Sequence, residues 1–466
     1  MNNTINIYNS LTRKKEEFIP INSPQVNIYT CGVTVYDESH IGHARSLYIF
    51  DVIRRYLKYR GFKVNFVRNI TDIDDKIINR ANELKVDWKD LVKKYIDRYY
   101  EDLQSLGIEK GDFEPRATEN IPEMIKYIQG LIDKGFAYVT NRGVYFSVRK
   151  FKNYGKLSGQ STEQMLTGVR KEPDETKEDP LDFALWKISK PGEPSWDSPC
   201  GKGRPGWHIE CSVMSQEFLK TDTLDIHAGG RDLIFPHHEN EIAQAEALTG
   251  KPFAKYWIHH GLLTINGRKM AKSLGNFVTI RDFLDKYHDA DILKIFFLSA
   301  HYSQPIDYND NKIEESKRAL DRINEFLFKA HEFNKEVHKT SESDFEEINK
   351  IKIKFEESMD DDFNTPRAIA SIFDLVSLGN KNIENKDFFA SAINMLGKLS
   401  SVLGMSLTKF TFTTDEGEIQ SLILERKEAR KKGDFSRADK IREDLEKKGV
   451  ILQDTKNGKT IWRRKS

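Results

Sequence analysis

Cysteine is scarce in this chain. Only three occur among its 466 residues, at Cys31, Cys200 and Cys211. Three cysteines are too few to form the disulfide framework of a secreted protein of this length, and an odd number cannot all be paired. We therefore expect a protein of a reducing compartment.

Long apolar runs are absent as well. No stretch of about 18 apolar residues appears that could cross a bilayer, and the N-terminus carries Asn, Thr, Lys and Glu where a secretory signal needs an apolar segment. We therefore expect no membrane association and predict a cytoplasmic enzyme or binding protein.

The chain also lacks an excess of either charge. Lys and Arg number 73 against 72 Asp and Glu, so any basic surface that binds nucleic acid must be local. With 38% hydrophobic and 31% charged residues, the composition excludes general disorder. The length exceeds that of a single hydrophobic core and predicts about three or four structural units.

Alternating strands and helices are what the sequence does contain. Apolar, β-rich runs at residues 26–31 and 63–68 flank a segment of helical periodicity at residues 44–60. This pattern predicts a βαβ unit, in which ligands bind beyond the carboxyl ends of the strands. The same alternation resumes at residues 224–227, after a mixed, Pro- and Gly-rich passage that we interpret as an insertion.

The tetrapeptide His40-Ile41-Gly42-His43 lies where the exit loop of the first strand becomes a helix. Backbone amides and two imidazoles can converge there on phosphate oxygens, and Gly42 allows a close approach. The alternative is a pair of surface histidines near a helix cap, and the tetrapeptide alone does not decide between the two.

A second motif lies at residues 267–276, where Lys269 and Lys272 occupy a Gly-flanked loop after an expected hairpin. Such lysines can neutralise a leaving pyrophosphate, although an ordinary solvated basic loop is the alternative for this segment alone. Both motifs occur in this order with a strand–helix sheet between them, which favours phosphate binding by each.

Residues with metal affinity gather near the expected sheet edge. Cys31 ends the first strand, and Cys211 lies in the stretch Gly206-Trp207-His208-Ile209-Glu210-Cys211. His237 and Glu241 are four residues apart, which on a helix puts both side chains on one face. Thiolates with imidazole and carboxylate suit Zn²⁺ better than Mg²⁺ or Ca²⁺, although each residue alone could equally be buried structure. Spacing leaves the imidazole ligand open among His208, His227, His237 and His238.

The two phosphate-binding motifs resemble the signature motifs of class I aminoacyl-tRNA synthetases. Ala271 departs from the family pattern, which has serine there, so no hydroxyl contact is implied at that position. The resemblance implies an ATP site with Mg²⁺, in which two histidines stabilise the phosphates and two lysines clamp pyrophosphate. Its members are His40, Gly42, His43, Lys269, Lys272 and Ser273.

Residues 206–212 and 225–244 are similar to the cysteinyl-tRNA synthetases, and the likeness runs over nearly the whole chain. It implies ATP-dependent ligation of L-cysteine to its tRNA by a monomer, with Cys200 left as a free thiol. It also implies one zinc ion held by Cys31, Cys211, His237 and Glu241.

Zinc would solve a problem of discrimination, because cysteine and serine differ by one atom and a pocket separates near-isosteres by only about 10². A thiol binds zinc as the thiolate, whereas a serine hydroxyl is a poor ligand. A zinc ion with four protein ligands normally has no open coordination position. We therefore predict that the ion takes a fifth ligand when the substrate binds. Trp207 is expected in the cysteine pocket, and Thr71 and Asp232 are candidates for holding its amine, with core packing or a helix cap as the alternative.

The C-terminal tail carries the local basic charge. Residues 419–466 hold 15 Lys and Arg against 8 Asp and Glu, a net charge of +7. Arg437, Trp462, Arg463 and Arg464 combine phosphate-binding charge with an aromatic platform for a base, which resembles the family's anticodon-binding domain. A solvated basic tail with a buried tryptophan is the alternative.

These observations predict an α/β Rossmann-type catalytic domain with an insertion, then an α-helical bundle and a small C-terminal anticodon-binding domain. The expected units are residues 1–119 and 207–265 for the two halves of the catalytic domain, 120–206 for the inserted connective region, 266–312 for the lysine loop and stem-contact region, 313–404 for the bundle and 405–466 for the anticodon-binding domain.

Two rival functions remain. A related cysteine ligase that couples the adenylate to a sugar amine would share the zinc site and both ATP motifs, but the C-terminal domain argues against it. A zinc-bearing RNA-binding protein without catalysis would need one ATP motif to be broken, and both are intact apart from Ala271.

Overall fold

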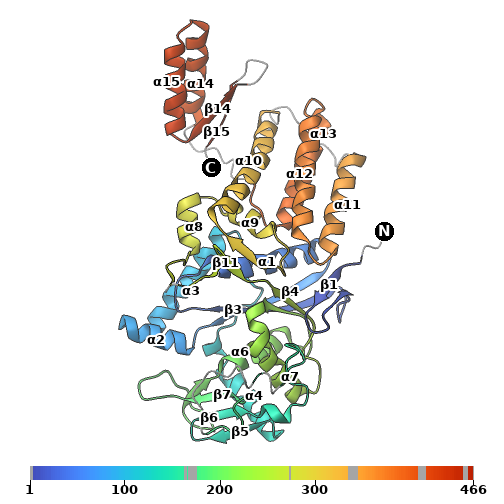
Figure 1. Ribbon diagram of the computed structural model, residues 1–466, viewed down its shortest axis with the longest axis vertical. Coiled ribbons are helices and arrows are strands. Elements are labelled where there is room, and N and C mark those ends of the chain that lie inside the picture. The colour runs from blue at the N-terminus through green and yellow to red at the C-terminus, as the bar shows by residue number, and fades with distance from the viewer. Residues whose placement is uncertain are drawn as a thin grey trace.

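A four-stranded parallel sheet lies at the centre of the molecule (Figure 1). The computed structural model describes residues 4–161, 165, 176–271, 274–333, 345–407, 416–454 and 460–464. The strands follow the order β10–β9–β3–β4, with bounds Ala254–His260, Leu224–Gly230, Gln25–Thr34 and Lys63–Thr71. Because every neighbouring pair is parallel, the carboxyl ends of the strands meet at one edge of the sheet.

Helices cover both faces of this sheet, so its strands are buried on both sides. Ile28 of β3 packs into a core that includes α1 (Ile41–Tyr59) and α9 (Ala290–Leu298). The next residue, Tyr29, packs into a second core with α6 (Trp207–Leu219) and α7 (Glu239–Thr249). Successive side chains of a strand point to opposite faces, which explains why the adjacent residues Ile28 and Tyr29 are both buried. The predicted Rossmann-type α/β fold is confirmed.

The segment between β4 and β9 adds a second sheet. Helix α4 (Ile121–Asp133) precedes four antiparallel strands in the order β5–β6–β7–β8, at Ala137–Thr140, Gly143–Phe146, Phe183–Ile188 and Gly203–Pro205. Strand β6 is followed by a single helical turn, Val148–Lys150. This sheet shares the hydrophobic core of α6 and α7.

After β10 the chain forms a small mixed sheet. Strand β11 (Leu263–Ile265) pairs with β12 (Arg268–Lys269) in the expected hairpin and runs parallel to β13 (Ile306–Tyr308). Helix α8 (Ile280–Tyr287) is capped by Thr279, whose hydroxyl accepts from the Asp282 N–H in a capping box.

A helical bundle follows, formed by α10 (Asp310–Phe333), α11 (Glu346–Asp360), α12 (Thr365–Lys381) and α13 (Lys386–Val402). Two buried tyrosines of α1 connect the bundle to that helix through hydrogen bonds. The Tyr48 hydroxyl donates to the Leu403 carbonyl at 2.6 Å, and the Tyr56 hydroxyl donates to Asp360 at 2.6 Å. The bundle and the sheet therefore share one hydrophobic core.

The C-terminal unit lies at one end of the molecule (Figure 1) and has its own small hydrophobic core. It consists of α14 (Glu416–Lys431), α15 (Phe435–Lys447) and the hairpin β14–β15 (Val450–Asp454 and Thr460–Arg464). The remaining elements are the N-terminal hairpin β1–β2 (Asn6–Asn9 and Lys14–Glu17), α2 (Asp75–Leu84) and α3 (Trp88–Ser105). None of the described helices combines the length and apolar character needed to span a bilayer.

Candidate active site

Four side chains with metal affinity meet at the carboxyl edge of the parallel sheet. Cys31 lies near the end of β3, and Cys211 lies on α6. His237 belongs to a kinked turn, Ile234–His238, that follows β9, and Glu241 lies in the first turn of α7. Cys31 is half-buried, while the other three are at most 1% exposed. Residues far apart in the sequence thus form one cluster because parallel strands end at the same edge.

The spacing of the donor atoms suits a tetrahedral metal ion. The two sulfur atoms lie 3.8 Å apart, Cys211 Sγ lies 3.6 Å from His237 Nε2, and Cys31 Sγ lies 3.6 Å from Glu241 Oε1. Tetrahedral zinc, with Zn–S bonds of about 2.3 Å and Zn–N or Zn–O bonds of about 2.0–2.1 Å, requires edges of about 3.8 and 3.6 Å. The His237–Glu241 edge, at 2.8 Å, is shorter.

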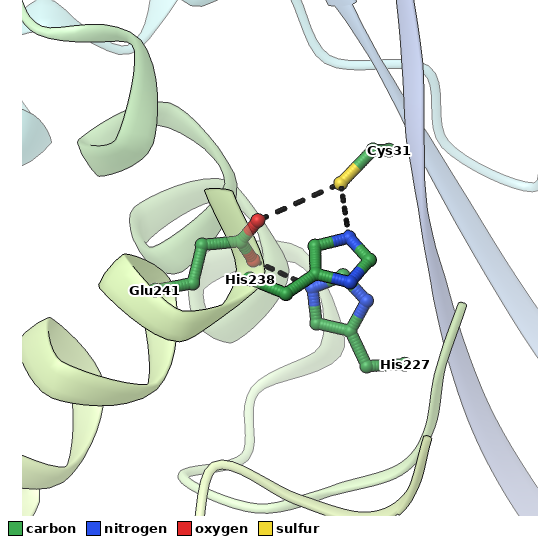
Figure 2. A group of neighbouring side chains, drawn as sticks. All are labelled: Cys31, His227, His238 and Glu241. Carbon is green, nitrogen blue, oxygen red and sulfur yellow. Dashed lines mark hydrogen bonds and ion pairs between the residues drawn. The ribbon is translucent and has the colours of Figure 1, made fainter. Parts of the chain in front are cut away.

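A second group shares two members of the first. Figure 2 shows His227 and His238 beside Cys31 and Glu241, and these four could also hold an ion. His238 Nε2 lies 3.2 Å from Cys31 Sγ, and His227 Nε2 lies 2.5 Å from Glu241 Oε2. Both distances are shorter than the tetrahedral edges of about 3.6 Å and 3.3 Å. The first group therefore has the better geometry for zinc.

Charge is already concentrated at the cluster. Burial opposes it, but His227 and His237 hold the pKa of the Glu241 carboxyl well below its usual range. Despite burial, contacts with Cys31 and His237 lower the pKa of the Cys211 thiol to about 6. Burial raises the pKa of the Cys31 thiol, and the neighbouring Cys211 and Glu241 raise it further. An ionised thiolate and a carboxylate side by side are donors that attract a divalent cation.

The other histidines surround the cluster as hydrogen-bonding partners. His208 Nδ1 lies 2.8 Å from His237 Nδ1, and His238 Nδ1 lies 2.9 Å from His259 Nε2. His259 continues to the Ser10 hydroxyl at 2.8 Å. Such outer contacts fix the orientation of the rings that face a metal. His259 and Ser10 were not predicted from the sequence. Only their positions at or next to the end of a strand could have indicated them.

The two signature histidines form the N-terminal cap of α1. His40 Nδ1 accepts the His43 backbone N–H at 3.2 Å, and His43 Nδ1 accepts the His40 backbone N–H at 3.3 Å. A Cβ atom on Gly42 would lie 2.9 Å from the His40 ring, so a larger residue there would require that ring to shift. Burial, together with the charges of His40 and Lys76, lowers the pKa of His43 to about 3.

Residues of the loop that carries Lys269 contact the same N-terminal end of α1. Ile41 N–H donates to the Val278 carbonyl at 3.1 Å, and the Met270 side chain lies against Gly42. Within the loop, Asn276 accepts the Ala271 N–H at 2.9 Å and donates to the Lys269 carbonyl at 3.1 Å. The Lys269 side chain is exposed. Lys272 and Ser273 lie outside the described residues.

The three candidate substrate contacts lie in different surroundings. The Trp207 ring stacks on His237 with centroids 4.0 Å apart and is 37% exposed. Thr71 is buried at the end of β4 and donates to Glu210 Oε2 at 2.8 Å. Asp232 is exposed in a single turn after β9. Glu210 was missed in the sequence, although it lies next to Cys211 in the stretch that carries the family resemblance.

The candidate tRNA contacts belong to the C-terminal unit. Trp462 is 8% exposed and packs in the core of that unit with Leu445 and Leu452. Arg437 on α15 forms an ion pair with Glu425 on α14. Arg463 and Arg464 lie on β15, and their side chains are outside the described set. Their contacts with tRNA stay predictions.

Three family models match consecutive parts of the chain. Residues 17–318 match the class I (C) tRNA synthetase catalytic domain, residues 354–408 match the DALR domain, and residues 416–463 match the cysteinyl-tRNA ligase anticodon binding domain. The first model alone covers more than half of the chain and includes both signature motifs and all the candidate metal ligands.

Solved structures share the fold at low sequence identity. A Mycobacterium tuberculosis methionyl-tRNA synthetase in complex with methionyl-adenylate is 14% identical, with a TM-score of 0.59 over 86% of this chain and 94% of that chain. The Agrobacterium radiobacter K84 agnB2 LeuRS–tRNA–LeuAMS complex is 11% identical, with a TM-score of 0.64 over 84% of this chain and 86% of that chain.

Curated relatives match along almost their entire lengths. The Cysteine--tRNA ligase of Thermodesulfovibrio yellowstonii is 51% identical over 98% of this chain and 99% of its own length. Those of Persephonella marina and Aquifex aeolicus are 48% and 47% identical, each over 99% of this chain and 100% and 99% of their own lengths. This chain therefore belongs to the cysteine--tRNA ligase family of class I aminoacyl-tRNA synthetases.

Proposed function

We propose that this chain joins L-cysteine to the tRNA that reads cysteine codons, through a cysteinyl-adenylate formed from ATP. The observation that carries the proposal is that two cysteines, a histidine and a glutamate that could hold a metal ion lie at the same sheet edge as the start of α1, which His40 and His43 cap. An enzyme that must select a thiol and activate the attached carboxylate needs both features within one substrate length. The relatives that carry the name Cysteine--tRNA ligase over their whole lengths support the choice of substrates.

Zinc is the metal that the first group suits. Two thiolates, an imidazole and a carboxylate are a donor set typical of zinc, and three donor–donor distances are close to those of a tetrahedral ion. Cys31, Cys211, His237 and Glu241 would hold it. When bound, zinc would supply a Lewis acid for the substrate thiolate, for which a serine hydroxyl is a poor substitute.

Activation of cysteine transfers an adenylyl group. A carboxylate oxygen of cysteine attacks the α-phosphorus of ATP, and the bond from that phosphorus to the bridging oxygen breaks, so that pyrophosphate leaves. His40 and His43 donate from Nε2 to phosphate oxygens, because Nδ1 of each ring accepts a backbone N–H. Gly42 leaves room for the nucleotide, and Mg²⁺ accompanies it. Lys269 and Lys272 balance the charge of the leaving pyrophosphate, and Ser273 contributes to the ATP site; Lys272 and Ser273 lie outside the described residues.

Transfer to tRNA completes the reaction. A hydroxyl of the terminal ribose, the 2′-hydroxyl in most class I enzymes, attacks the carbonyl carbon of the adenylate, and AMP leaves. Residues 416–463, which match the anticodon-binding model, would bind the far end of the tRNA. Basic residues such as Arg437, Arg463 and Arg464 would provide the charge for that contact. We propose that one chain acts as a monomer.

Cysteine-dependent exchange of pyrophosphate into ATP, measured without tRNA, tests the activation step. Exchange with cysteine and its absence with serine is the expected result, followed by aminoacylation when tRNA is added. Binding of RNA without exchange would leave the zinc-bearing RNA-binding protein as the better alternative. Exchange with transfer only to a sugar amine would support the sugar ligase, although the match at residues 416–463 favours tRNA.

A further inference from the structure

A network of four charged side chains lies beside the signature histidines. Arg281, in the first turn of α8, forms ion pairs with Glu101 of α3 and with Glu38, whose Oε2 lies 3.7 Å from Arg281 Nε. Arg98 of α3 forms ion pairs with the same two carboxylates, at 2.9 Å and 3.7 Å. Glu38 lies two residues before His40 in the loop that follows β3. The proposed reaction has used none of these four residues.

Each charge in this network faces opposite charges. Hydrogen bonds from Arg98 and Arg281 lower the pKa of the Glu101 carboxyl, so this group is ionised at neutral pH. The four side chains are between 28% and 54% exposed. A single exposed ion pair contributes little to stability, whereas several charges in a network hold a geometry more firmly. The network therefore connects α8, α3 and the approach to His40 without forming part of a core.

The backbones of the same segments are also paired. The Ile41 N–H donates to the Val278 carbonyl at 3.1 Å, and the Ile280 N–H donates to the Ser39 carbonyl at 3.0 Å. Each donor is the first residue of its helix, α1 or α8, where the backbone N–H has no partner within the helix. The two helix starts thus satisfy each other's open donors and lie side by side.

The ion pair between Glu38 and Arg281 extends this pairing. His40 and Thr279 are antiparallel bridge partners, and in that register Glu38 lies opposite Arg281. Side chains that lie opposite each other across an antiparallel pair are close neighbours, and opposite charges there stabilise the pair. Arg281 therefore holds the start of α8 against the residues that lead into the signature motif.

Fixing residues 278–281 also fixes one end of the loop that carries Lys269. The hairpin β11–β12 holds the other end of the loop. Asn276 joins the two ends, because it accepts the Ala271 N–H at 2.9 Å and donates to the Lys269 carbonyl at 3.1 Å. Asn276 is only two residues before Val278. A displacement of Val278 from α1 would therefore displace Asn276 and the backbone of Lys269 with it.

We propose that Arg281 is a positioning residue for the activation of the amino acid. Through Glu38 and Glu101 it holds the end of the loop that carries Lys269 against the start of α1. The lysine and the two histidines then face the same phosphates while pyrophosphate leaves. This inference rests on the proposed function, in which Lys269 balances the charge of pyrophosphate. A charge that is held in place beforehand needs no rearrangement when the transition state forms.

The two half-reactions should respond differently to the loss of Arg281. Pyrophosphate leaves in the first half-reaction, so the lysine has its charge to balance only there. Transfer of cysteine from a preformed adenylate to tRNA does not need that contact. If Arg281 only stabilised the fold, its loss would lower the melting temperature and slow both half-reactions.

Arg281→Gln is the variant to test, because it removes the charge and keeps a polar side chain, and Arg281→Lys is the conservative variant. Lys286→Gln is the matched control, since Lys286 lies on the same helix and forms an ion pair with Asp310 of α10. Each protein is measured for zinc content, for kcat and KM in pyrophosphate exchange, and for single-turnover transfer from the isolated enzyme–adenylate complex to tRNA. Hydrogen exchange is followed in the peptides that contain Ile41 and Ile280.

The expected defect is confined to activation. Arg281→Gln should lower kcat of pyrophosphate exchange by about 3- to 10-fold, the scale of one or two lost exposed ion pairs. KM for cysteine, zinc content and single-turnover transfer should be unchanged, and the amides of Ile41 and Ile280 should exchange faster. Arg281→Lys should retain most of the rate, and Lys286→Gln should retain all of it. Adding Glu101→Gln to Arg281→Gln should cost little more than Arg281→Gln alone.

An unchanged kcat in Arg281→Gln, an equal loss in Lys286→Gln, or an equal slowing of transfer would overturn the inference. The proposed function is judged separately, by exchange of pyrophosphate in the unaltered protein. If that reaction fails, hydrogen exchange at Ile41 and Ile280 still decides whether Arg281 holds the two helix starts together.

Discussion

His40 and His43 together cap the N-terminal end of α1. The Nδ1 atom of each ring accepts the backbone N–H of the other residue, and the rings stack with centroids 3.6 Å apart. A neutral imidazole that accepts through Nδ1 carries its proton on Nε2. The helix start therefore presents two N–H donors on stacked rings, an arrangement suited to phosphate oxygens.

Gly42→Ala tests this arrangement, because the added methyl group would lie 2.9 Å from two atoms of the His40 ring. The ring must move, and the cap and the aligned Nε2 donors are lost together. We expect pyrophosphate exchange to fall by about 10²-fold in kcat, the scale of one lost transition-state donor, with zinc content unchanged. Exchange assays and metal analysis on the same preparation check this.

Gly397→Ala is the control for that variant. Gly397 also lies inside a helix, α13, but a Cβ atom there would meet nothing within 4 Å. The change should leave exchange intact and raise the melting temperature slightly, because alanine is the better helix former by about 0.5–1 kcal/mol. Comparable loss of exchange in both variants would mean that the close approach at Gly42 is unimportant.

Acid should destabilise the folded protein partly through His43. Burial, with the charges of His40 and Lys76, lowers its pKa to about 3, whereas an unfolded histidine titrates near 6.5. Between these values the unfolded chain binds the extra proton, so stability is lost as the pH falls below about 6.5. Between pH ~7 and ~5, the melting temperature of the His43→Asn variant should fall by less than that of the unaltered protein. An equal loss in the two proteins would contradict this assignment.

Local patterns explain which groupings within the candidate site could be predicted. The apolar, β-rich run at residues 26–31 indicated a strand, and the motif at His40–His43 follows that strand after a short loop. His237 and Glu241 lie 2.8 Å apart, as a separation of four residues predicts. In each case the relevant spacing is short, so the sequence carries it without knowledge of the fold.

The remaining features depend on contacts between distant elements. The hydrogen bond between Thr71 and Glu210 joins residues 139 positions apart and requires the packing of α6 on β4. Trp462 illustrates the same limit, since an aromatic residue in a basic tail can be a platform for a base or part of a core. Its position opposite Leu452 in the β14–β15 hairpin buries it. No local pattern in the tail distinguishes these outcomes.

Removing the C-terminal unit should separate the two half-reactions. The unit has its own hydrophobic core, and both signature motifs and the candidate metal ligands lie earlier in the chain. A chain that ends at Leu407 should retain cysteine-dependent pyrophosphate exchange and show strongly reduced aminoacylation of tRNA. Full aminoacylation by the shortened chain would remove the proposed role of residues 416–463.

Variants of two adjacent histidines distinguish between the two overlapping groups of candidate metal ligands. His237 belongs to the group with both cysteines, and His238 belongs to the group with His227. Because the first group has the distances closer to a tetrahedral zinc ion, His237→Ala should lose zinc and cysteine activation. His238→Ala should retain the metal. The reverse pattern of zinc content would assign the ion to the second group.

Cysteine variants complete this test, because Cys31 belongs to both groups and Cys211 to only one. Cys211→Ser should lose zinc if His237 does, and should keep it if His238 is the ligand. Cys200→Ser is the matched control, since Cys200 is a free thiol that belongs to neither group. Agreement between the histidine and cysteine variants is needed, because a side chain that only supports a neighbouring ligand would affect one series without the other.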